Sequence, residues 1–235
     1  GGAFGRRRRE DDLAFETVAA LGRLGGDSAG FFDQCLQILA ESADADLAGI
    51  DVFAEASDSR LLSLATWRRD GSGQTLAYAL SGSPSAEALA REQLVIPADA
   101  HLFYPACGWM TNEKVSGYFG QAVRDGDGVR LGVLWVAATG PSSADALMSR
   151  VMPVFAERIA AEIGRQRERA GLTLAASLFE HSPRAVMISD ARRRILSVNP
   201  AFTRITGWPP EAIRGRRDEM LSAGRDGPGL RAEID

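Results

Sequence analysis

The chain has 235 residues, of which 45% are hydrophobic and 25% charged, and its formal net charge is -4. This length and hydrophobic content suffice for one or two folded domains and exclude a disordered chain. The 31 acidic residues outnumber the 27 basic ones, which argues against a nucleic-acid-binding protein because phosphate contacts need a positive face. The run Arg6 to Arg9 is followed by acidic residues, so we interpret residues 1–11 as a solvated lead-in to a helix.

The two cysteines, Cys35 and Cys107, are too few for a disulfide scaffold, and neither stands in a C-x-x-C pair. No run approaches the roughly 18 apolar residues that a membrane span needs, and the first residues lack the apolar core of a secretory signal. We therefore expect a cytoplasmic region with no membrane segment of its own.

The first part of the chain has the pattern of two helices followed by strands. A helix is predicted from Asp12 to Leu24, and Asp27 with Ser28 gives an N-cap signal for a second helix. Half-buried alternation then predicts adjacent antiparallel strands with one covered face. These strands are expected over residues 47–53, 61–67 and 75–80.

Residues 81–110 are the least regular part, with a short helical run at 86–91 and a strand-like run at 94–96. Irregular backbone on a rigid sheet is where binding residues concentrate. Aromatic side chains accumulate here and on the neighbouring strands, namely Tyr78, Phe103, Tyr104, Trp109, Tyr118, Phe119 and Trp135. They either line a ligand cavity or fill an ordinary core under a long loop, and the sequence leaves both open.

A β-hairpin is the strongest local prediction. Two apolar runs, residues 115–123 and 129–137, flank the segment Arg124 to Gly128. Its Asp-Gly pairs favour a tight turn because glycine accepts a positive φ angle.

A long helix is predicted next, from Ala144 to Phe179, with apolar residues three or four positions apart up to Ile163. Pro153 predicts a kink or a restart near Met152, because proline removes a helical hydrogen bond. Gly171 coincides with a shift of the apolar stripe and predicts a joint. We expect the first part to close the first domain and the second part to connect to another.

This order of elements, over roughly Leu13 to Gln166, resembles a GAF domain. Tyr78-Ala79-Leu80-Ser81-Gly82-Ser83-Pro84 is similar to the family's Y-x-L-x-G-T-P stretch, and the hairpin segment beginning at Ser116 is similar to its S-Y-x-G-x-P-L motif. Ser85 stands where many relatives carry cysteine, and Ala122 replaces the usual proline. The N-K-F-D-E signature of cyclic-nucleotide-binding members is missing, and neither cysteine precedes a histidine as in bilin-attaching ones, so no cofactor is named.

The resemblance implies an α+β fold with a GAF-like antiparallel sheet flanked by helices, and a small-molecule site on the side of the irregular segment. The candidate ligand-binding residues are Tyr78, Ser85, His101, Phe103, Tyr104, Trp109, Tyr118 and Trp135. We expect a GAF-like domain over 12–166 and a connector helix over 167–181.

The C-terminal part resembles the opening half of a PAS domain. The sequence I-S-D…I-L-S-V-N-P-A-F-T-x-I-T-G-W predicts a β-hairpin and a helix that starts at Pro200 and stops at Gly207. The segment Met220 to Asp226 is similar to the L-S-S-G-R-H-D segment of PAS domains in cyclic di-GMP signalling proteins. A complete PAS sheet needs three further strands after Asp235, so we expect an incomplete PAS-like α/β module over 182–235, less ordered than the first domain or completed by a partner chain.

We recognise no nucleophile with a base, no paired acid and base and no metal cluster, so we predict no enzyme in this region. His101 with Cys107 does not make a metal site, and His181 is interpreted as a capping or surface residue. The GAF and PAS resemblances instead imply the sensory region of a bacterial signalling protein, upstream of a diguanylate cyclase or phosphodiesterase, and we expect a homodimer through its terminal helices. The alternatives are a ligand-free dimerisation scaffold and the input region of a sensor histidine kinase.

Overall fold

The structure of the protein is a computed structural model that describes residues 2–25, 30–54, 57–142 and 144–218. The chain divides into two compact units, Gly1–Gly164 and Arg165–Asp235. One helix, α6 (Asp145–His181), contributes residues to both units. Among the described helices, none combines the length and the hydrophobicity that crossing a membrane requires.

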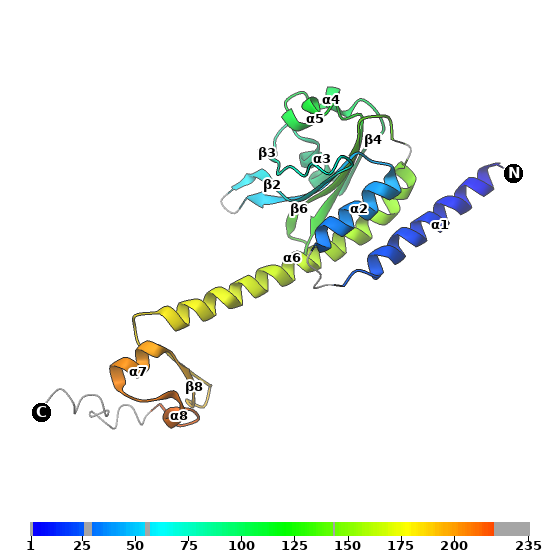
Figure 1. The fold of residues 1–235 in the computed structure, drawn as a ribbon. Coiled ribbons are helices and arrows are strands. Elements are labelled where there is room, and N and C mark those ends of the chain that lie inside the picture. Colours follow the sequence, from blue (N-terminus) through cyan, green and yellow to red (C-terminus); the bar gives the residue numbers. More distant parts are fainter. Residues whose placement is uncertain (1, 26–29, 55–56, 143, 219–235) are drawn as a thin grey trace, which may run out of the picture. The chain divides into compact units, whose positions relative to one another are not determined.

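The first unit is built on a six-stranded sheet with the order β3-β2-β1-β6-β5-β4, in which every neighbouring pair is antiparallel (Figure 1). The strands are β1 (Leu47–Ala54), β2 (Ser57–Arg68), β3 (Ala77–Ala79), β4 (Gln93–Ile96), β5 (Gly117–Arg124) and β6 (Arg130–Ala138). The sheet and its helices confirm the predicted α+β class. Strand β3 is shorter than the predicted run 75–80.

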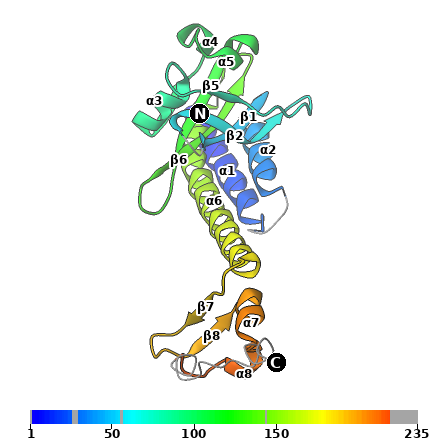
Figure 2. The same cartoon turned by 90° about the vertical axis from the view of Figure 1, so that its left-hand side faces the viewer.

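One face of the sheet is covered by α1 (Gly2–Gly22), α2 (Phe31–Ala43) and the first part of α6, as Figure 2 shows. Apolar side chains from these helices and from β1, β5 and β6 form the larger core. Helix α1 begins well before Asp12, so the predicted lead-in is helical. The predicted cap at Asp27 and Ser28 lies outside the described residues.

The other face carries three short helices, α3 (Pro84–Arg91), α4 (Ala100–Phe103) and α5 (Gly108–Asn112). Strand alternation separates the two faces. On β1, Ala48 and Ile50 enter the larger core, while Gly49 and Asp51 contact Trp135, which belongs to a second core on this face. The second core is rich in aromatic and small side chains and includes Tyr118, Met110 and Ala122.

The predicted hairpin is confirmed as the β5–β6 pair. Asp125 Oδ1 accepts hydrogen bonds from the backbone N–H groups of Asp127 (3.0 Å) and Val129 (2.8 Å). Gly128 has a φ angle of 80°, the left-handed conformation that glycine adopts without strain.

Helix α6 is uninterrupted from Asp145 to His181, so the restart near Met152 is wrong, while a kink at Pro153 and a joint at Gly171 stay predictions. Buried side chains stand on both sides of Pro153, including Met152 and Phe155, and this packing holds the helix in register. A glycine in a helix costs only about 1 kcal/mol relative to alanine, which is too little to end it alone.

The second unit contains β7 (Met187–Ser189) and β8 (Ile195–Val198), which pair antiparallel, and the helices α7 (Pro200–Thr206) and α8 (Pro210–Ile213). The side chain of Asn199 caps α7 by accepting from Phe202 N, and Gly207 ends it with a φ angle of 73°. The helix predicted from Pro200 to Gly207 is thereby confirmed. A small core joins these elements through Ile195, Val198, Phe202 and Ile213. The predicted Met220 to Asp226 segment lies outside the described residues.

Candidate functional site

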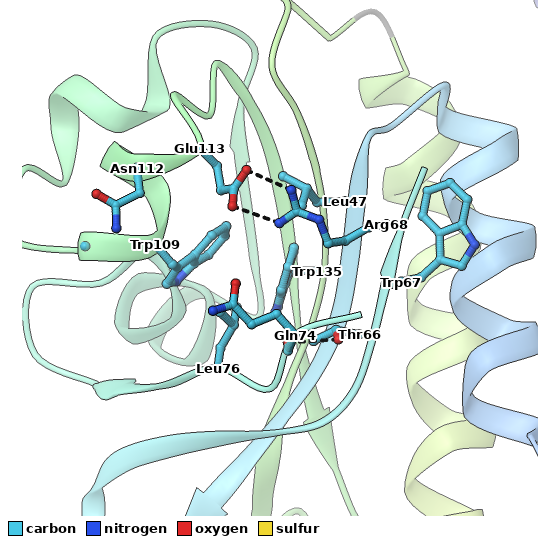
Figure 3. Close-up of a pocket in the computed structure, with 11 residues that line it drawn as sticks. Leu47, Thr66, Trp67, Arg68, Gln74, Leu76, Trp109, Asn112, Glu113 and Trp135 are labelled. Carbon is cyan, nitrogen blue, oxygen red and sulfur yellow. Dashed lines mark hydrogen bonds and ion pairs between the residues drawn. The ribbon is translucent and has the colours of Figure 1, made fainter. Parts of the chain in front are cut away.

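A pocket of about 250 Å³ opens on the aromatic-rich face of the first unit (Figure 3). It lies between the end of β2, the start of β1 and helix α5, and the segment that leads from β2 to β3 forms its lower side. Its lining residues are Leu47, Thr66, Trp67, Arg68, Gln74, Leu76, Gly108, Trp109, Asn112, Glu113 and Trp135. Ligand cavities commonly measure about 300–1,000 Å³, and this one lies just below that range, so it has room only for a small molecule.

The aromatic side of the pocket is a stacked pair of indoles. Trp109 lies over Trp135 with ring centroids 4.6 Å apart and an interplanar angle of 29°. Trp135 is 1% exposed and is fitted against Gly49, where a Cβ atom would come within 2.4 Å of Trp135 Cζ2. Glycine at position 49 is therefore what allows the indole to lie flat on the sheet.

The polar side of the pocket is the ion pair between Arg68 and Glu113. Arg68 Nη1 donates to Glu113 Oε1 at 2.8 Å, and Arg68 Nη2 donates to Glu113 Oε2 at 3.0 Å. This two-pronged geometry is the strong form of a guanidinium–carboxylate contact, and it raises the pKa of Arg68. Alternation along β2 explains the placement, because Arg68 and Thr66 face the pocket while Trp67 packs against the larger core.

A buried carboxylate lies on the inner side of Trp135. Asp51 is 0% exposed, and its Oδ2 atom accepts from Trp135 Nε1 and from the Tyr78 hydroxyl, each at 2.6 Å. Its Oδ1 atom accepts from Ser63 Oγ at 2.7 Å. The Tyr78 hydroxyl also lies 2.8 Å from Ser85 Oγ, and Ser85 is the donor when Tyr78 donates to Asp51. These contacts tie β1, β2, β3, α3 and β6 together.

Burial dominates the titration of this cluster. It raises the pKa of Asp51, and the hydrogen bonds from Tyr78, Ser63 and Trp135 oppose that rise without cancelling it. The pKa of Tyr78 is raised well above its usual range by burial first and by the neighbouring Asp51 second. Both groups therefore hold their protons more tightly than they would in water.

Two polar atoms in this region are buried without a hydrogen-bond partner in the described part of the chain. They are Trp109 Nε1 and the Tyr118 hydroxyl, whose rings have centroids 6.5 Å apart. A buried donor without a partner costs about 1–3 kcal/mol.

The structure brings together five of the eight candidate ligand-binding residues predicted from the sequence. Tyr78 is hydrogen-bonded to Ser85, and the Trp109 ring contacts the rings of Tyr78, Tyr118 and Trp135. Of these five, Trp109 and Trp135 line the pocket itself.

The other three candidates lie apart from the pocket lining. His101 Nδ1 is 2.8 Å from the carbonyl oxygen of Val115. Tyr104 donates its hydroxyl hydrogen to Glu87 at 2.7 Å. Phe103 is 68% exposed. The binding role of the whole set stays a prediction.

Sequence reasoning missed Arg68, Glu113 and Asp51. Asp51 is the only acid within the apolar run 47–53, and an acid on the covered face of a predicted strand is a signal for a buried polar site. The pairing of Arg68 with Glu113 spans 45 positions in the sequence and carries no such local signal.

Both cysteine side chains are buried. Burial raises the pKa of Cys35 to about 12 and that of Cys107 to about 11, so neither is a reactive thiolate at neutral pH. Within the residues that the structure describes, no group of three His, Cys, Asp or Glu side chains is placed to hold a metal ion.

The fold of the first unit is shared with solved structures. The GAF domain of a phosphoenolpyruvate-protein phosphotransferase from Coxiella burnetii matches with a TM-score of 0.53 and 16% identity, over 69% of this chain and 96% of that one. The first unit has a GAF-like fold. At such identity the likeness concerns the fold alone.

Two further structures with this GAF-like fold have different printed roles. One is the free methionine-R-sulfoxide reductase of Neisseria meningitidis in complex with its substrate, with a TM-score of 0.52 and 14% identity over 68% of this chain and 91% of that one. The other is the chromophore-binding domain of phytochrome P1 from Stigmatella aurantiaca, with a TM-score of 0.51 and 12% identity over 65% and 59%. The fold therefore does not decide the function.

The second unit has a family match of its own. Residues 174–234 match the family model described as a PAS domain. The match covers the end of α6, the β7–β8 hairpin and the two short helices. The chain thus joins a GAF-like unit to a PAS-type segment, as the sequence motifs predicted.

Proposed function

We propose that this chain is the sensory and dimerising region of a bacterial signal-transduction protein. In this proposal a small molecule binds in the pocket between Trp109 and the Arg68–Glu113 pair, and α6 relays the change to the PAS-type segment. The observation that carries the proposal is the pocket itself, in which indole rings and the Arg68–Glu113 ion pair meet on one sheet face. A few polar groups in a mostly apolar concavity are typical of a ligand site.

The course of α6 supports the relay. Its residues Leu147 to Ile163 contribute ten buried side chains, most of them to the core of the GAF-like unit. The same helix then continues, and its segment from Gln166 to Leu178 is exposed. A ligand that binds two states of the pocket with different affinity would shift how such helices pack, which is what coupling between sites requires.

Exposed leucines support the dimer. Leu174 and Leu178 are exposed and stand four residues apart, with Gly171 three residues before them. This is the spacing of a helix–helix seam, and two copies would bury it. The effector in this proposal is a diguanylate cyclase or a cyclic di-GMP phosphodiesterase, and a sensor histidine kinase is the alternative.

A ligand-free scaffold is the second candidate function. The observation that favours it is that Tyr118 and Trp135 are almost fully buried and already fill the inner part of the aromatic face. In that case the pocket would bind no ligand, and the GAF-like unit would serve dimerisation alone.

A ligand screen by thermal unfolding separates the two candidates. We would screen a panel of nucleotides, haem, aromatic acids and other small acids against the full chain. We expect at least one class to raise the melting temperature in a concentration-dependent way, because a ligand that binds only the folded state stabilises it. Trp109→Ala should abolish the shift, while Phe32→Leu, on the helix-covered face of the sheet, should retain it. An unchanged melting temperature with every compound would favour the scaffold.

A further inference from the structure

The charged residues that line the pocket form one ion pair, Arg68–Glu113, and Arg68 Nε also lies 3.4 Å from Asp70 Oδ1, outside that lining. Among the described residues that line it, Arg68 is the one cation and Glu113 the one anion. Their side chains are 20% and 30% exposed, so the pair is at the pocket surface and accessible to a ligand. Figure 3 shows the pair at the upper edge of the pocket, with both indoles below it.

The Glu113 carboxylate binds the Arg68 guanidinium in the way that a ligand carboxylate would. Both of its oxygens accept from the guanidinium, at 2.8 and 3.0 Å. Glu113 follows directly after α5, and its backbone N–H donates to the Trp109 carbonyl at 3.1 Å. An exchange of this carboxylate for another would therefore reach the helix turn that carries the pocket indole.

The remaining lining is suited to a flat apolar ring. Leu47 and Leu76 are the aliphatic lining residues, and Trp109 presents an indole already stacked on Trp135. Aromatic rings gain most from offset stacking on such a surface. The volume of about 250 Å³ limits the ring system to one or two fused rings.

The surroundings favour a single negative charge over two. An adjoining depression of about 360 Å³ shares Arg68 and Glu113 and is also lined by Asp46, Asp70 and Arg69. Arg69 is already paired with Asp44 and Asp46, at 2.7 and 3.1 Å. With three acids against two arginines there, a dianion such as a phosphate would meet more repulsion than a carboxylate.

The geometry points to a small aromatic carboxylic acid as the ligand of this pocket. Its ring would lie against Trp109, and its carboxylate would take Arg68 from Glu113. Glu113 then competes with the ligand, because it is paired with Arg68 when no acid is bound. This inference rests on the proposed function and names the ligand class of the same pocket.

Calorimetric titration of the full chain tests the exchange. The probes are sodium benzoate and sodium indole-3-carboxylate, with benzamide and indole-3-carboxamide as neutral counterparts. We expect each acid to bind about tenfold or more tightly than its amide, because hydrogen bonds to a charged group are the stronger ones. Arg68→Gln should remove this preference. Glu113→Gln should strengthen binding of the acids several-fold and leave the amides unchanged, since only the acids compete with Glu113.

Arg69→Gln is the matched control, because Arg69 is the neighbouring arginine and does not line the pocket. It should leave the preference for acids intact. Equal binding of acid and amide, or weaker acid binding by Glu113→Gln, would overturn the inference. If another compound class binds at Trp109 while neither acid does, the inference is wrong and the proposed function stands. If no compound binds, both are wrong. Glu113→Gln keeps the test decisive even where Arg68→Gln folds poorly.

Discussion

The side-chain amide of Gln93 donates a hydrogen bond to the backbone carbonyl of Ser149 at 3.2 Å. In a regular helix this carbonyl would accept from the N–H of residue 153, which is a proline and has none. Gln93 Nε2 also donates to Gln121 Oε1 at 2.8 Å. A residue at the start of the edge strand β4 thus satisfies the acceptor that Pro153 leaves open in α6.

Removal of Gln93 should destabilise the protein more when residue 153 is proline than when it is alanine. We expect Gln93→Ala to lower the free energy of unfolding by about 0.5–1.5 kcal/mol, because the Ser149 carbonyl loses its donor. In a Pro153→Ala background, residue 153 supplies the N–H, so the same substitution should cost less. Urea unfolding of the four proteins in this double-mutant cycle measures the difference. If Gln93→Ala cost the same in both backgrounds, the hydrogen bond from Gln93 to Ser149 would not compensate for the missing N–H of Pro153.

The buried Asp51 should make stability depend on pH in a defined direction. Its pKa is raised in the folded state above the ordinary value of 3.8, so between these two values the folded protein binds more proton than the unfolded one. Stability from this group is therefore present at low pH and lost as pH rises through the raised pKa. Asp51→Asn cannot ionise, so the cost of the substitution should shrink as pH rises.

Urea unfolding of wild type and Asp51→Asn between pH 4.5 and pH 8 measures this trend. At the acidic end we expect Asp51→Asn to lower the free energy of unfolding by about 2–4 kcal/mol. The substitution replaces a buried, hydrogen-bonded carboxyl by an amide, whose NH₂ group cannot accept the same hydrogen bonds. A cost that grows with pH would mean that Ser63, Tyr78 and Trp135 stabilise the carboxylate and hold its pKa low.

Gly49→Ala should disturb the indole platform. The new Cβ atom would lie 2.4 Å from Trp135 Cζ2, so the ring or strand β1 must move. We expect a loss of about 1–3 kcal/mol in stability and a changed near-ultraviolet circular dichroism spectrum. Gly164→Ala is the matched control, because no atom lies within 4 Å of its Cβ position and it stands in a helix. It should be neutral or stabilising, by up to about 1 kcal/mol.

What the sequence predicted well is local. The start of α7 at Pro200 with its stop at Gly207, and the turn between Asp125 and Gly128, depend on residues within a few positions of one another. The candidate site depends on pairs far apart in the chain, such as Asp51 with Trp135, which are separated by 84 positions. Only the register of the sheet brings them together. The sequence therefore predicted the aromatic character of the face but not the carboxylate behind it or the ion pair at its edge.

The helix after Gly164 should pair with its copy in a dimer. Leu174→Glu should weaken dimerisation about tenfold or more, because it places a charge in the apolar seam. Ala176→Glu, an exposed position on another side of the same helix, is the control and should leave the dimer intact. Light scattering across a concentration series measures both. A wild-type mass that is monomeric at every concentration would contradict the proposed dimer.

Hydrogen–deuterium exchange of the full chain tests the central claim most directly. The measurement compares the protein alone with the protein saturated by the tightest-binding compound of the panel. We predict slower exchange in residues 108–114, which carry Trp109 and Glu113, together with a change in α6 between Gln166 and Leu178. Unchanged exchange in residues 108–114 would contradict the pocket as the ligand site, and unchanged exchange after Gly164 would contradict the relay through α6.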